Sequence, residues 1–398
     1  MEIIKGSVTA PNGFTASGIN CGLKKDKLDL ALIFSEVPAL AAGIFTKNAL
    51  RAAPVIISRK YLNRGKAQAI IANSGNANCL TGKQGFKDAE KIVETVSSFL
   101  SVKKGGVLIA STGIIGKPLP ADKIIGAIPK LVKELGKIGE IAAAKAIMTT
   151  DLYPKKIAVS VNISGKTVKI GGIAKGSGMI CPDMATMLCF LTTDADIELK
   201  ALKTCLMESA GNSFNSITVD GDMSTNDTVF ILANSLAGNP KIKQGTPDYK
   251  KFRDCLNYVS VYLAKEIAKD GEGASKFIEV EVKKAASETE AKKIAAKIAN
   301  SNLVKTAMAG EDPNVGRIAS AAGAASLKLD ESKLDIYLNG IKIVCGGNVD
   351  YQKMSLTKKA LKKKDINITV DLNSGGSSAK VWTCDLTEGY IKINARYN

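Results

Sequence analysis

Residues 175–197 (KGSGMICPDMATMLCFLTTDADI) constrain the fold more than any other stretch of the chain. The first half of this stretch places two glycines and a proline among short polar residues, whereas residues 185–191 are apolar and rich in strand formers. The pattern predicts a loop that runs directly into a buried β-strand. Thr186, which follows Ala185, is expected at the point where the strand begins.

A small residue followed by a hydroxyl at this junction fits a chain that cuts itself. The Thr186 hydroxyl attacks the carbonyl of Ala185, the peptide bond becomes an ester, and water releases a new N-terminal threonine. The freed α-amine has a reference pKa of roughly 7.7–8.0, so it can act as the base for its own hydroxyl. The alternative is an ordinary buried strand in which Thr186 is one β-branched residue among several.

The absence of histidine restricts the chemistry that this chain can perform. It excludes a Ser-His-Asp triad, a Cys-His dyad and every metal site that needs histidine. The base of a hydrolase or acyltransferase would have to be a lysine, a carboxylate or an α-amine. The eight cysteines form no Cys-x-x-Cys pair and lie mostly in apolar contexts, so we expect reduced core residues and no metal site.

Length and charge narrow the class of protein. A chain of 398 residues suggests two or three lobes. The N-terminus lacks an apolar signal region, and no stretch approaches the roughly 18 apolar residues of a membrane span, so we expect a soluble cytoplasmic protein. The net charge of +17 comes from scattered lysines, and only 5% of residues are aromatic, which favours a solvated surface over nucleic-acid binding.

Periodicity predicts alternating strands and helices along the chain. Residues 106–110 form a predicted strand that leads into STGIIG, where Thr112 and Gly113 are expected in a tight turn whose backbone N–H groups resemble an oxyanion hole. A plain strand-to-helix turn is the alternative. Glu272 lies between two glycines, where a carboxylate can point into a cleft. Other predicted strands are 54–58, 156–163, 167–173 and 390–394, and predicted helices include 86–100 and 248–269.

Several blocks of the sequence resemble one known family. They are KGSGMICPDMATMLCF, PNGFTASGINCGLK, ANSGNANCLTG, STGIIG, DGDMSTNDT, DGEGASKF and YIKINARY. In this order they are similar to the ornithine acetyltransferases, also called glutamate N-acetyltransferases, of arginine biosynthesis. The likeness extends from one end of the chain to the other.

The resemblance implies specific roles for individual residues. Thr186 would be the nucleophile, with cleavage between Ala185 and Thr186, and the oxyanion site would come from Thr112 and Gly113. The residues implied to bind substrate are Thr149, Lys175, Glu272 and Asn394. Lys175 suits a substrate carboxylate, and Glu272 suits a substrate ammonium.

The resemblance also implies a fold and a division of the chain. The fold would be α/β (α+β), a layered arrangement of mixed sheets and helices of the self-cleaving amidohydrolase kind. Cleavage would give an N-terminal chain, 1–185, and a C-terminal chain, 186–398, with a strand-rich lobe from about residue 325. The two chains would stay associated in a heterotetramer of two α and two β chains.

The implied reaction moves the acetyl group of N-acetylornithine to glutamate through an acetyl-threonine, without metal or prosthetic group. Whether acetyl-CoA is a second donor stays open at this point. This sequence departs from the family pattern at two places. Asp183 stands where the family usually has asparagine. The sequence stops at Asn398, whereas family members commonly continue to a substrate-binding hydroxyl residue. The rival functions are a self-processing N-terminal-threonine aminopeptidase or amide hydrolase, and a basic nucleic-acid-binding protein.

Overall fold

The computed structural model describes residues 1–181, 187–325 and 329–396, which fall into two compact units. The first unit is drawn from Met1–Gly176, Asp183–Asn215 and Met223–Ile267. The second is drawn from Ser177–Pro182, Ser216–Asp222 and Ala268–Asn398. The predicted cut between Ala185 and Thr186 lies outside the described residues and stays a prediction.

The first unit is built on a mixed sheet with the order β1-β6-β7-β8-β9-β3-β4-β5, in which β2 also pairs with β3. The pairs β8–β9 and β4–β5 are parallel, and the other pairs are antiparallel. Strand β3 joins the two halves of the sheet, because its beginning pairs with β2 and its end pairs with β9. The strands are β1 (Glu2–Ile4), β2 (Phe14–Ile19), β3 (Leu30–Phe45), β4 (Lys66–Asn76), β5 (Val107–Ile114), β6 (Lys155–Ile163), β7 (Lys166–Lys175), β8 (Leu188–Thr193) and β9 (Thr228–Ala233).

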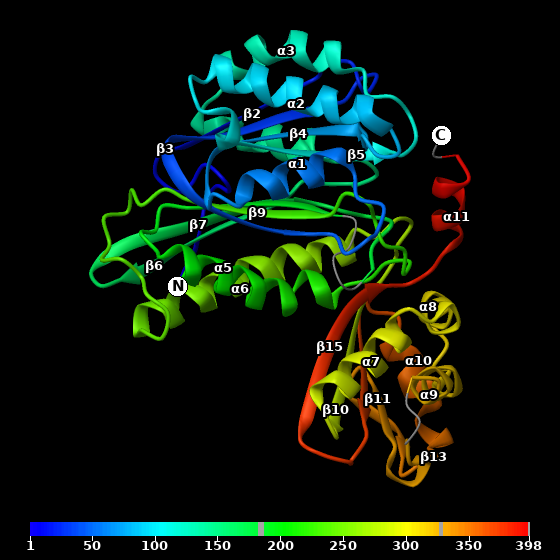
Figure 1. Ribbon diagram of the computed structural model, residues 1–398. Helices are drawn as coiled ribbons and strands as arrows, with labels where there is room; N and C mark the ends of the chain where they lie inside the picture. Colours follow the sequence, from blue (N-terminus) through cyan, green and yellow to red (C-terminus); the bar gives the residue numbers. More distant parts are fainter. Residues whose placement is uncertain (182–186, 326–328, 397–398) are drawn as a thin grey trace. The chain divides into compact units, whose positions relative to one another are not determined.

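Helices cover both outer faces of this unit, and the two halves of the sheet pack against each other between them (Figure 1). Alternation along β4 shows the two faces: Ile70 packs in the cluster that contains Phe190 and Phe230, whereas Ile71 packs in the cluster that contains α2 and α3. On the opposite outer face, a Cβ at Gly172 would lie 2.9 Å from Leu263 of α6. The helices are α1 (Ala53–Leu62), α2 (Gly82–Phe99), α3 (Ala121–Lys133), α4 (Glu140–Ala146), α5 (Leu199–Gly211) and α6 (Pro247–Lys269).

The second unit is a six-stranded mixed sheet with helices on one face. Its strand order is β13-β12-β11-β14-β10-β15, and Ile278, Val280 and Val282 of β10 pack with α7 and α9 in one apolar core. The strands are β10 (Phe277–Ala285), β11 (Asp335–Leu338), β12 (Ile341–Cys345), β13 (Asn348–Val349), β14 (Asp365–Asp371) and β15 (Ser377–Cys384). The helices are α7 (Glu288–Ala299), α8 (Asn302–Ala309), α9 (Val315–Gly323), α10 (Met354–Ala360) and α11 (Glu388–Asn394).

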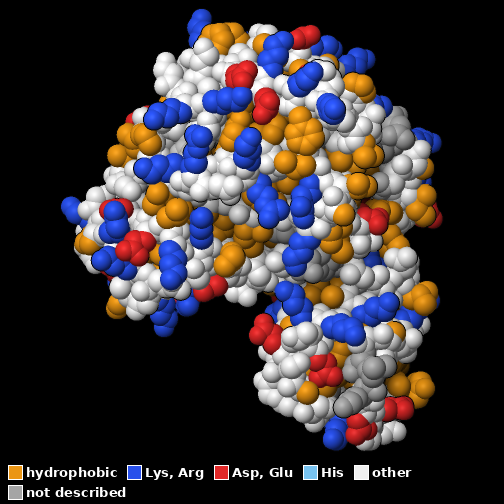
Figure 2. Space-filling view, viewed as in Figure 1, with side chains coloured by type: hydrophobic (Ala, Val, Ile, Leu, Met, Phe, Trp, Pro, Cys, Tyr) orange, Lys and Arg blue, Asp and Glu red, His pale blue; other side chains and the backbone are white. Residues whose placement is uncertain are grey.

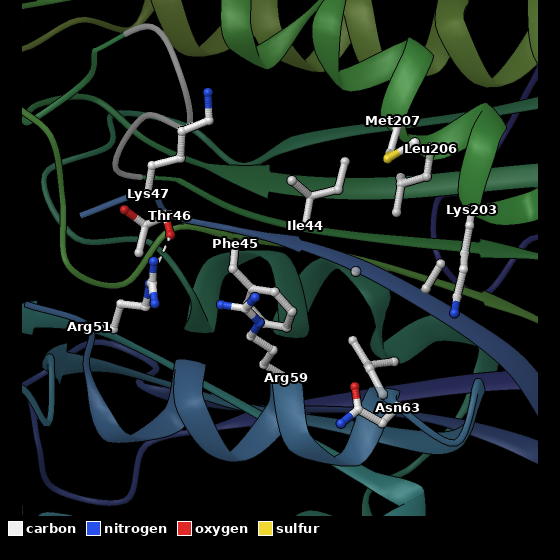
Figure 3. A pocket seen from close by; sticks show the side chains of 13 residues that line it. Ile44, Phe45, Thr46, Lys47, Arg51, Arg59, Asn63, Lys203, Leu206 and Met207 are labelled. Atoms are coloured by element: carbon white, nitrogen blue, oxygen red, sulfur yellow. Dashed lines mark hydrogen bonds between the residues drawn. The ribbon is translucent and has the colours of Figure 1, made fainter. Parts of the chain in front are cut away.

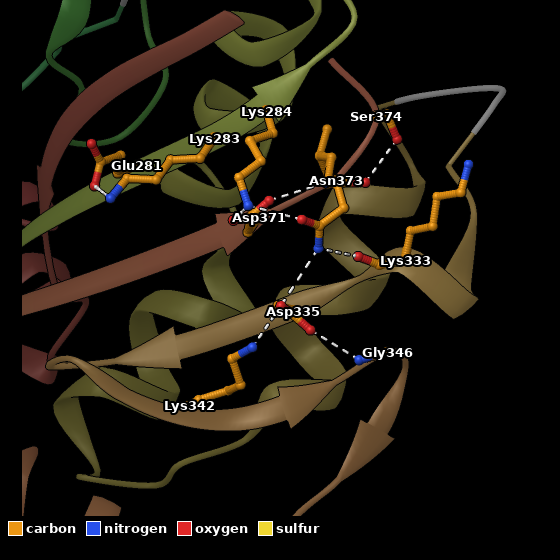
Figure 4. A network of polar contacts seen from close by, with 11 residues as sticks. Glu281, Lys283, Lys284, Lys333, Asp335, Lys342, Gly346, Asp371, Asn373 and Ser374 are labelled. Atoms are coloured by element: carbon orange, nitrogen blue, oxygen red, sulfur yellow. Dashed lines mark hydrogen bonds and ion pairs between the residues drawn. The ribbon is translucent and has the colours of Figure 1, made fainter. Parts of the chain in front are cut away.

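Ion pairs fix the strand ends of the second unit (Figure 4). Asp335, at the start of β11, accepts hydrogen bonds from Lys342 Nζ at 2.8 Å and from the N–H of Gly346 at 2.9 Å. Asp371, at the end of β14, pairs with Lys284 at 2.8 Å. Both aspartates are buried, whereas the two lysines are partly exposed, so water screens each pair from the lysine side and reduces its contribution to stability.

The structure confirms several of the predicted strands and helices and corrects two of the predicted strands. All six residues of β8 are buried, as expected for the strand after Thr186, and α2, α6 and the β6–β7 hairpin match their predicted positions. The strands predicted at 54–58 and 390–394 are wrong, because these residues lie in α1 and α11. Proline near the first position of α1 favours a helix start, and Thr387 caps α11 by accepting from the N–H of Gly389.

The surface carries the excess of positive charge in a dispersed form. Figure 2 shows Lys and Arg side chains over all of the visible face of the first unit and over much of the second. None of the helices in the described parts of the chain combines the length and the apolarity that a membrane span requires.

Candidate active site

Four neighbouring strands of the first unit end at one level of the sheet. Lys175 of β7 is paired with Leu188 of β8, Leu188 with Thr228 of β9, and Thr228 with Phe45 of β3. Leu188 is the first residue of β8, and Thr186 stands two residues before it in the chain. Thr186 and Ala185 themselves lie outside the described residues, so this row of strand ends marks the region that Thr186 adjoins.

Thr112 and Gly113 lie within strand β5 and not in the tight turn that the sequence predicts. Both are paired with β4, where the register shifts at Asn76. Gly113 has φ +130, and a Cβ at this position would lie 2.4 Å from the carbonyl carbon of Gly75. The backbones of β4 and β5 approach so closely here that only glycine fits at position 113. The irregular end of β4 therefore lies against Thr112.

Gly113→Ala is expected to disturb this strand end more than it disturbs the rest of the unit. A methyl group cannot fit at 2.4 Å from backbone, so β4 and β5 must separate locally, at a cost of about 1–3 kcal/mol. If this strand end holds an oxyanion, the kcat of the catalysed reaction should fall about 100-fold, with the substrate KM within about threefold of the wild-type value.

Steady-state kinetics and thermal unfolding measure the two effects of Gly113→Ala. Gly116→Ala is the matched control, because Gly116 also has a positive φ, of +82, but a Cβ there meets no atom within 4 Å. An equal loss of kcat in both variants would contradict a special role for the end of β5.

A buried group of charges lies beside the end of β7. Asp151 Oδ1 accepts from Lys155 Nζ at 2.7 Å and from the N–H of Gly176 at 2.7 Å. Lys175, which is 2% exposed, places its Nζ 3.5 Å from the hydroxyl oxygen of Thr112. Thr149 contributes its backbone N–H, which donates to Asp151 Oδ2 at 2.9 Å. The structure thus brings Thr149 and Lys175 to Asp151, and Thr112 to Lys175, so three of the predicted site residues lie in one group.

The electrostatics of this group favour binding of an anion. Burial alone would raise the pKa of Asp151, but the positive charges of Lys155 and then Lys175 outweigh it and lower the pKa to about 2. Asp151 is therefore ionised at neutral pH, and one carboxylate faces two ammonium groups. A carboxylate from a ligand that approaches the Lys175 ammonium would be stabilised by a charge-assisted hydrogen bond.

Lys24 extends the same group and had no signal in the sequence. Its Nζ donates to the carbonyl oxygen of Met148 at 2.8 Å. Burial, only partly offset by Asp29, lowers the pKa of Lys24 to about 8, and Lys175 contributes in the same direction as burial. Lys24 and Asp151 are 127 positions apart in sequence, so only the fold brings them together.

Asp227 is the nearest described carboxylate to the chain segment that follows Thr186. Its Oδ1 accepts from the N–H of Met187 at 3.1 Å, which is the amide of the peptide bond between residues 186 and 187. Its Oδ2 is buried and has no hydrogen-bond partner among the described residues, and burial raises the pKa of this carboxyl well above its usual value, against the opposing charge of Lys175. Asp227 and Met187 are 40 positions apart in sequence, so only the fold brings them together.

Asn226 ties this loop to the strand that carries Thr112. Its Nδ2 donates to the carbonyl oxygen of Ala77 at 2.6 Å and to that of Ser111 at 2.9 Å. Both bonds are buried, so the start of β9 and the end of β5 are held in fixed register. Thr112 and Met187 therefore both adjoin this set of buried hydrogen bonds.

The second unit contains the other two predicted site residues, and they contact each other. Asn394 Nδ2 donates to Glu272 Oε2 at 2.7 Å, and Glu272 is only 7% exposed. The N–H of Glu272 donates to the carbonyl oxygen of Ser177 at 2.8 Å. A Cβ at Gly178 would lie 2.4 Å from the Glu272 carboxylate, so glycine is required there to admit this side chain. Glu272 is thus a positioned carboxylate without a lysine or arginine against it in the contacts of the described residues.

Asp220 organises the same part of the second unit. Its two carboxylate oxygens accept from the N–H groups of Met179, at 2.6 Å, and Ile180, at 2.8 Å, and Tyr390 OH donates to it at 3.1 Å. Asp220 therefore connects residues 179–180 with α11, the helix that carries Asn394. Among the described residues no group of three or more Cys, Asp or Glu side chains is arranged to hold a metal ion.

Comparisons with known proteins place this geometry in context. The profile of the ArgJ family matches residues 15–398. The chain is 46% identical to the arginine biosynthesis bifunctional protein ArgJ of Symbiobacterium thermophilum, over all of both chains, and 47% identical to that of Oceanobacillus iheyensis, over all of this chain and 98% of the relative. The chain also matches the crystal structure of the ornithine acetyltransferase of Mycobacterium tuberculosis complexed with ornithine, with 40% sequence identity. This structural match covers 45% of this chain and 97% of that chain, at a TM-score of 0.42.

Proposed function

The chain belongs to the ArgJ family and is a bifunctional acetyltransferase of arginine biosynthesis, and we propose that it transfers acetyl groups through an ester on Thr186. The donor is N-acetylornithine, the acceptor is glutamate, and the products are ornithine and N-acetylglutamate. The observation that carries the proposal is that Lys175 is buried at the end of β7. Lys175 is paired there with Leu188 of β8, and Leu188 follows Thr186 by two positions in the chain. We place the activity in the cytoplasm.

The first step is activation of the chain by self-cleavage. The Thr186 hydroxyl attacks the carbonyl carbon of Ala185, the amide becomes an ester, and hydrolysis leaves residues 1–185 and 186–398. The hydrogen bond from the N–H of Met187 to Asp227 fixes the peptide group on the C-terminal side of Thr186 during this reaction. After cleavage, Thr186 carries a free α-amine next to its own hydroxyl.

The second step is formation of the acetyl ester. The α-amine takes the hydroxyl proton as the oxygen attacks the acetyl carbonyl, and Thr112 and Gly113 stabilise the developing negative charge. The amide bond breaks, and the amine of ornithine leaves with that proton. Glutamate then attacks the ester with its amine and regenerates the hydroxyl. No imidazole is needed at any step, in agreement with a chain that has no histidine.

Charge decides how the substrates are held. Lys175, with Asp151 and Lys155 behind it, binds the substrate α-carboxylate, and Thr149 lies against the same aspartate. Glu272, oriented by Asn394, binds the side-chain ammonium of the ornithine moiety. Both glutamate and acetylornithine carry an α-carboxylate, so one lysine serves both half-reactions.

Incubation of the processed enzyme with N-acetylornithine alone is expected to add one acetyl group to the fragment that begins at Thr186. The ester accumulates because no acceptor is present, and rapid acid quench with intact-mass measurement detects it. Initial rates at several concentrations of both substrates should give parallel lines in double-reciprocal plots. Intersecting lines, together with no trapped acetyl fragment, would indicate direct transfer.

The same reaction separates this function from its closest rival. An amide hydrolase with the same nucleophile would pass the acetyl group to water and release acetate, with or without glutamate. A transferase gives N-acetylglutamate when glutamate is added, and acetate release falls accordingly. Native mass measurement also tests the assembly, which we propose contains two copies of each chain.

The second activity of a bifunctional acetyltransferase requires a second acetyl donor. We propose that acetyl-CoA also acetylates Thr186, so that glutamate can be acetylated without N-acetylornithine. Product formation from acetyl-CoA and glutamate alone, measured as release of the free thiol, tests this activity directly.

A further inference from the structure

One buried carboxylate holds the loop between β2 and β3 in a fixed conformation. Asp29 is fully buried, and its carboxylate accepts from the N–H groups of Cys21 at 2.6 Å and Leu23 at 2.8 Å. The same carboxylate accepts from the N–H of Lys24 at 2.9 Å. Asn20 Nδ2 donates to the carbonyl oxygen of Lys24 at 2.9 Å. The backbone of Lys24 is therefore bonded on both sides, and its side chain extends from a defined position.

The side chain of Lys24 lies beside the strand end that carries the predicted oxyanion residues. A Cβ at Gly75 of β4 would lie 3.2 Å from Lys24 Cγ. Gly75 is paired with Gly113 of β5, and Ser74 is paired with Thr112. The stem of Lys24 thus lies close to the same paired strand ends that hold Thr112 and Gly113.

The ammonium of Lys24 reaches the segment that contains Thr149. Lys24 Nζ donates to the carbonyl oxygen of Met148, the residue that precedes Thr149 in the chain, at 2.8 Å. This is the one hydrogen bond that the ammonium makes with the residues that the structure describes. An ammonium carries three N–H donors, so two donors remain for a ligand.

Lys24 and Lys175 are two positive charges of one group. Burial lowers the pKa of Lys24 to about 8, so this side chain is mostly protonated at neutral pH. Asp29 and Asp151 act in the opposite direction to burial, and the charge of Lys175 acts in the same direction. Lys175 Nζ lies 3.5 Å from the hydroxyl oxygen of Thr112, at the strand end beside which Lys24 packs. A ligand with two carboxylates can therefore pair one with each lysine.

The two substrates of the proposed reaction differ in the charge of their side chains. Both carry an α-carboxylate, which Lys175 is proposed to bind. The ornithine moiety also has an ammonium, which suits Glu272, whereas glutamate has a second carboxylate, which a glutamate residue would repel. Lys155 is 1% exposed and is bonded to Asp151 at 2.7 Å, so it is enclosed by the protein. Lys24 is only partly buried, so a ligand can approach its ammonium.

We propose that Lys24 binds the side-chain carboxylate of the acceptor and thereby makes the enzyme specific for an acidic amino acid as acceptor. This inference rests on the proposed function, because it assumes that a free amino acid accepts the acetyl group. Lys175 and Lys24 hold the two carboxylates of one glutamate, whereas the donor uses Lys175 alone. Glutamine has the same shape as glutamate without the second charge, so the preference for glutamate over glutamine depends on Lys24.

Single charge-removal variants test this role. Lys24→Gln removes the charge and keeps a side-chain donor for the carbonyl oxygen of Met148, and Lys24→Arg keeps the charge. Lys25→Gln is the matched control in the same loop, because Lys25 is exposed. Lys203→Gln is a control elsewhere in the first unit. Lys203 lines a cavity of about 460 Å³ between β3, α1 and α5, and none of the described site residues lines that cavity (Figure 3).

Calorimetric titration with glutamate and with glutamine, without an acetyl donor, gives the two dissociation constants. Transfer kinetics give kcat/KM for each acceptor, and single-turnover acetylation by N-acetylornithine without an acceptor isolates the first half-reaction. In Lys24→Gln the preference for glutamate over glutamine is expected to fall about 10- to 100-fold, because one charge-assisted hydrogen bond is lost. The half-saturating concentration of N-acetylornithine should stay within about threefold of wild type.

The other variants are expected to keep the preference. Lys24→Arg should retain it within about threefold, since the charge remains, and the two control variants should retain it within about twofold. Thermal unfolding of each variant measures any loss of stability. A purely structural role of Lys24 would instead weaken both acceptors and the donor together.

Four results would overturn the inference. The first is an equal loss for glutamate and glutamine in Lys24→Gln, and the second is an equal loss for glutamate and N-acetylornithine. The third is a fall in preference in the control variants as large as in Lys24→Gln. The fourth needs no variant: wild-type protein that binds glutamine as tightly as glutamate. Absence of acetyl transfer from N-acetylornithine would contradict the proposed function, and the calorimetric comparison would still stand because it requires no transfer.

Discussion

Thr186→Ala is expected to yield one uncut chain of 398 residues that transfers no acetyl group. The substitution removes the only hydroxyl that can attack Ala185, so the peptide bond persists, and without cleavage no α-amine is formed to act as base. Loss of a covalent nucleophile typically costs on the order of 10⁵-fold or more in kcat. A denaturing gel and intact-mass measurement report cleavage, and the N-acetylornithine assay reports transfer.

Thr186→Ser is the variant that keeps this experiment falsifiable. Serine retains the hydroxyl, so we expect cleavage at the same bond and measurable transfer. Thermal unfolding of both variants checks that the buried strand β8 still forms, since residue 186 precedes it by two positions. A wild-type protein that is fully active while uncut, or a Thr186→Ala variant that still cleaves between residues 185 and 186, would end this mechanism.

Lys175→Met is expected to lower kcat/KM by about 100- to 1,000-fold and to move its acid limb to higher pH. Removal of one partner from a buried charge group costs about 2–5 kcal/mol in binding, because the substrate carboxylate loses its ammonium partner. The acid limb reports the α-amine of Thr186, whose reference pKa is roughly 7.7–8.0. A neighbouring positive charge disfavours protonation of that amine and lowers its pKa, so loss of Lys175 must raise it.

Lys175→Arg provides the control for charge. Arginine keeps a positive charge at the end of β7, so the acid limb should remain close to that of the wild-type enzyme even where a larger side chain reduces affinity. The pH profile of kcat/KM, corrected for ionisation of free substrate, separates a shift of the limb from a simple loss of activity. Identical limbs in wild type and Lys175→Met would remove Lys175 from the environment of the amine.

Local sequence patterns were sufficient for the elements that lie nearest the predicted nucleophile. The glycine-rich loop followed by an apolar run predicted β8, and the β6–β7 hairpin follows from alternating residues around Ser164 and Gly165. The errors at α1 and α11 have a common cause. Both are short helices that contain isoleucine or valine, and a short run with β-branched residues does not distinguish a strand from a helix.

The sequence by itself determined which chemistry is available to this protein. The absence of histidine, the Ala185-Thr186 junction and the family blocks together lead to a threonine nucleophile with an amine base, because these are properties of residue types and of neighbours in the chain. They do not depend on how distant segments meet.

Only the tertiary structure decided what surrounds that chemistry. Asp151 lies between Lys155 and Lys175, and Lys24, from near the N-terminus, lies in the same group of charges. Asp227 accepts a hydrogen bond from the N–H of Met187. Each of these contacts forms because strands distant in sequence are paired in one sheet, and local periodicity carries no information about which strands pair.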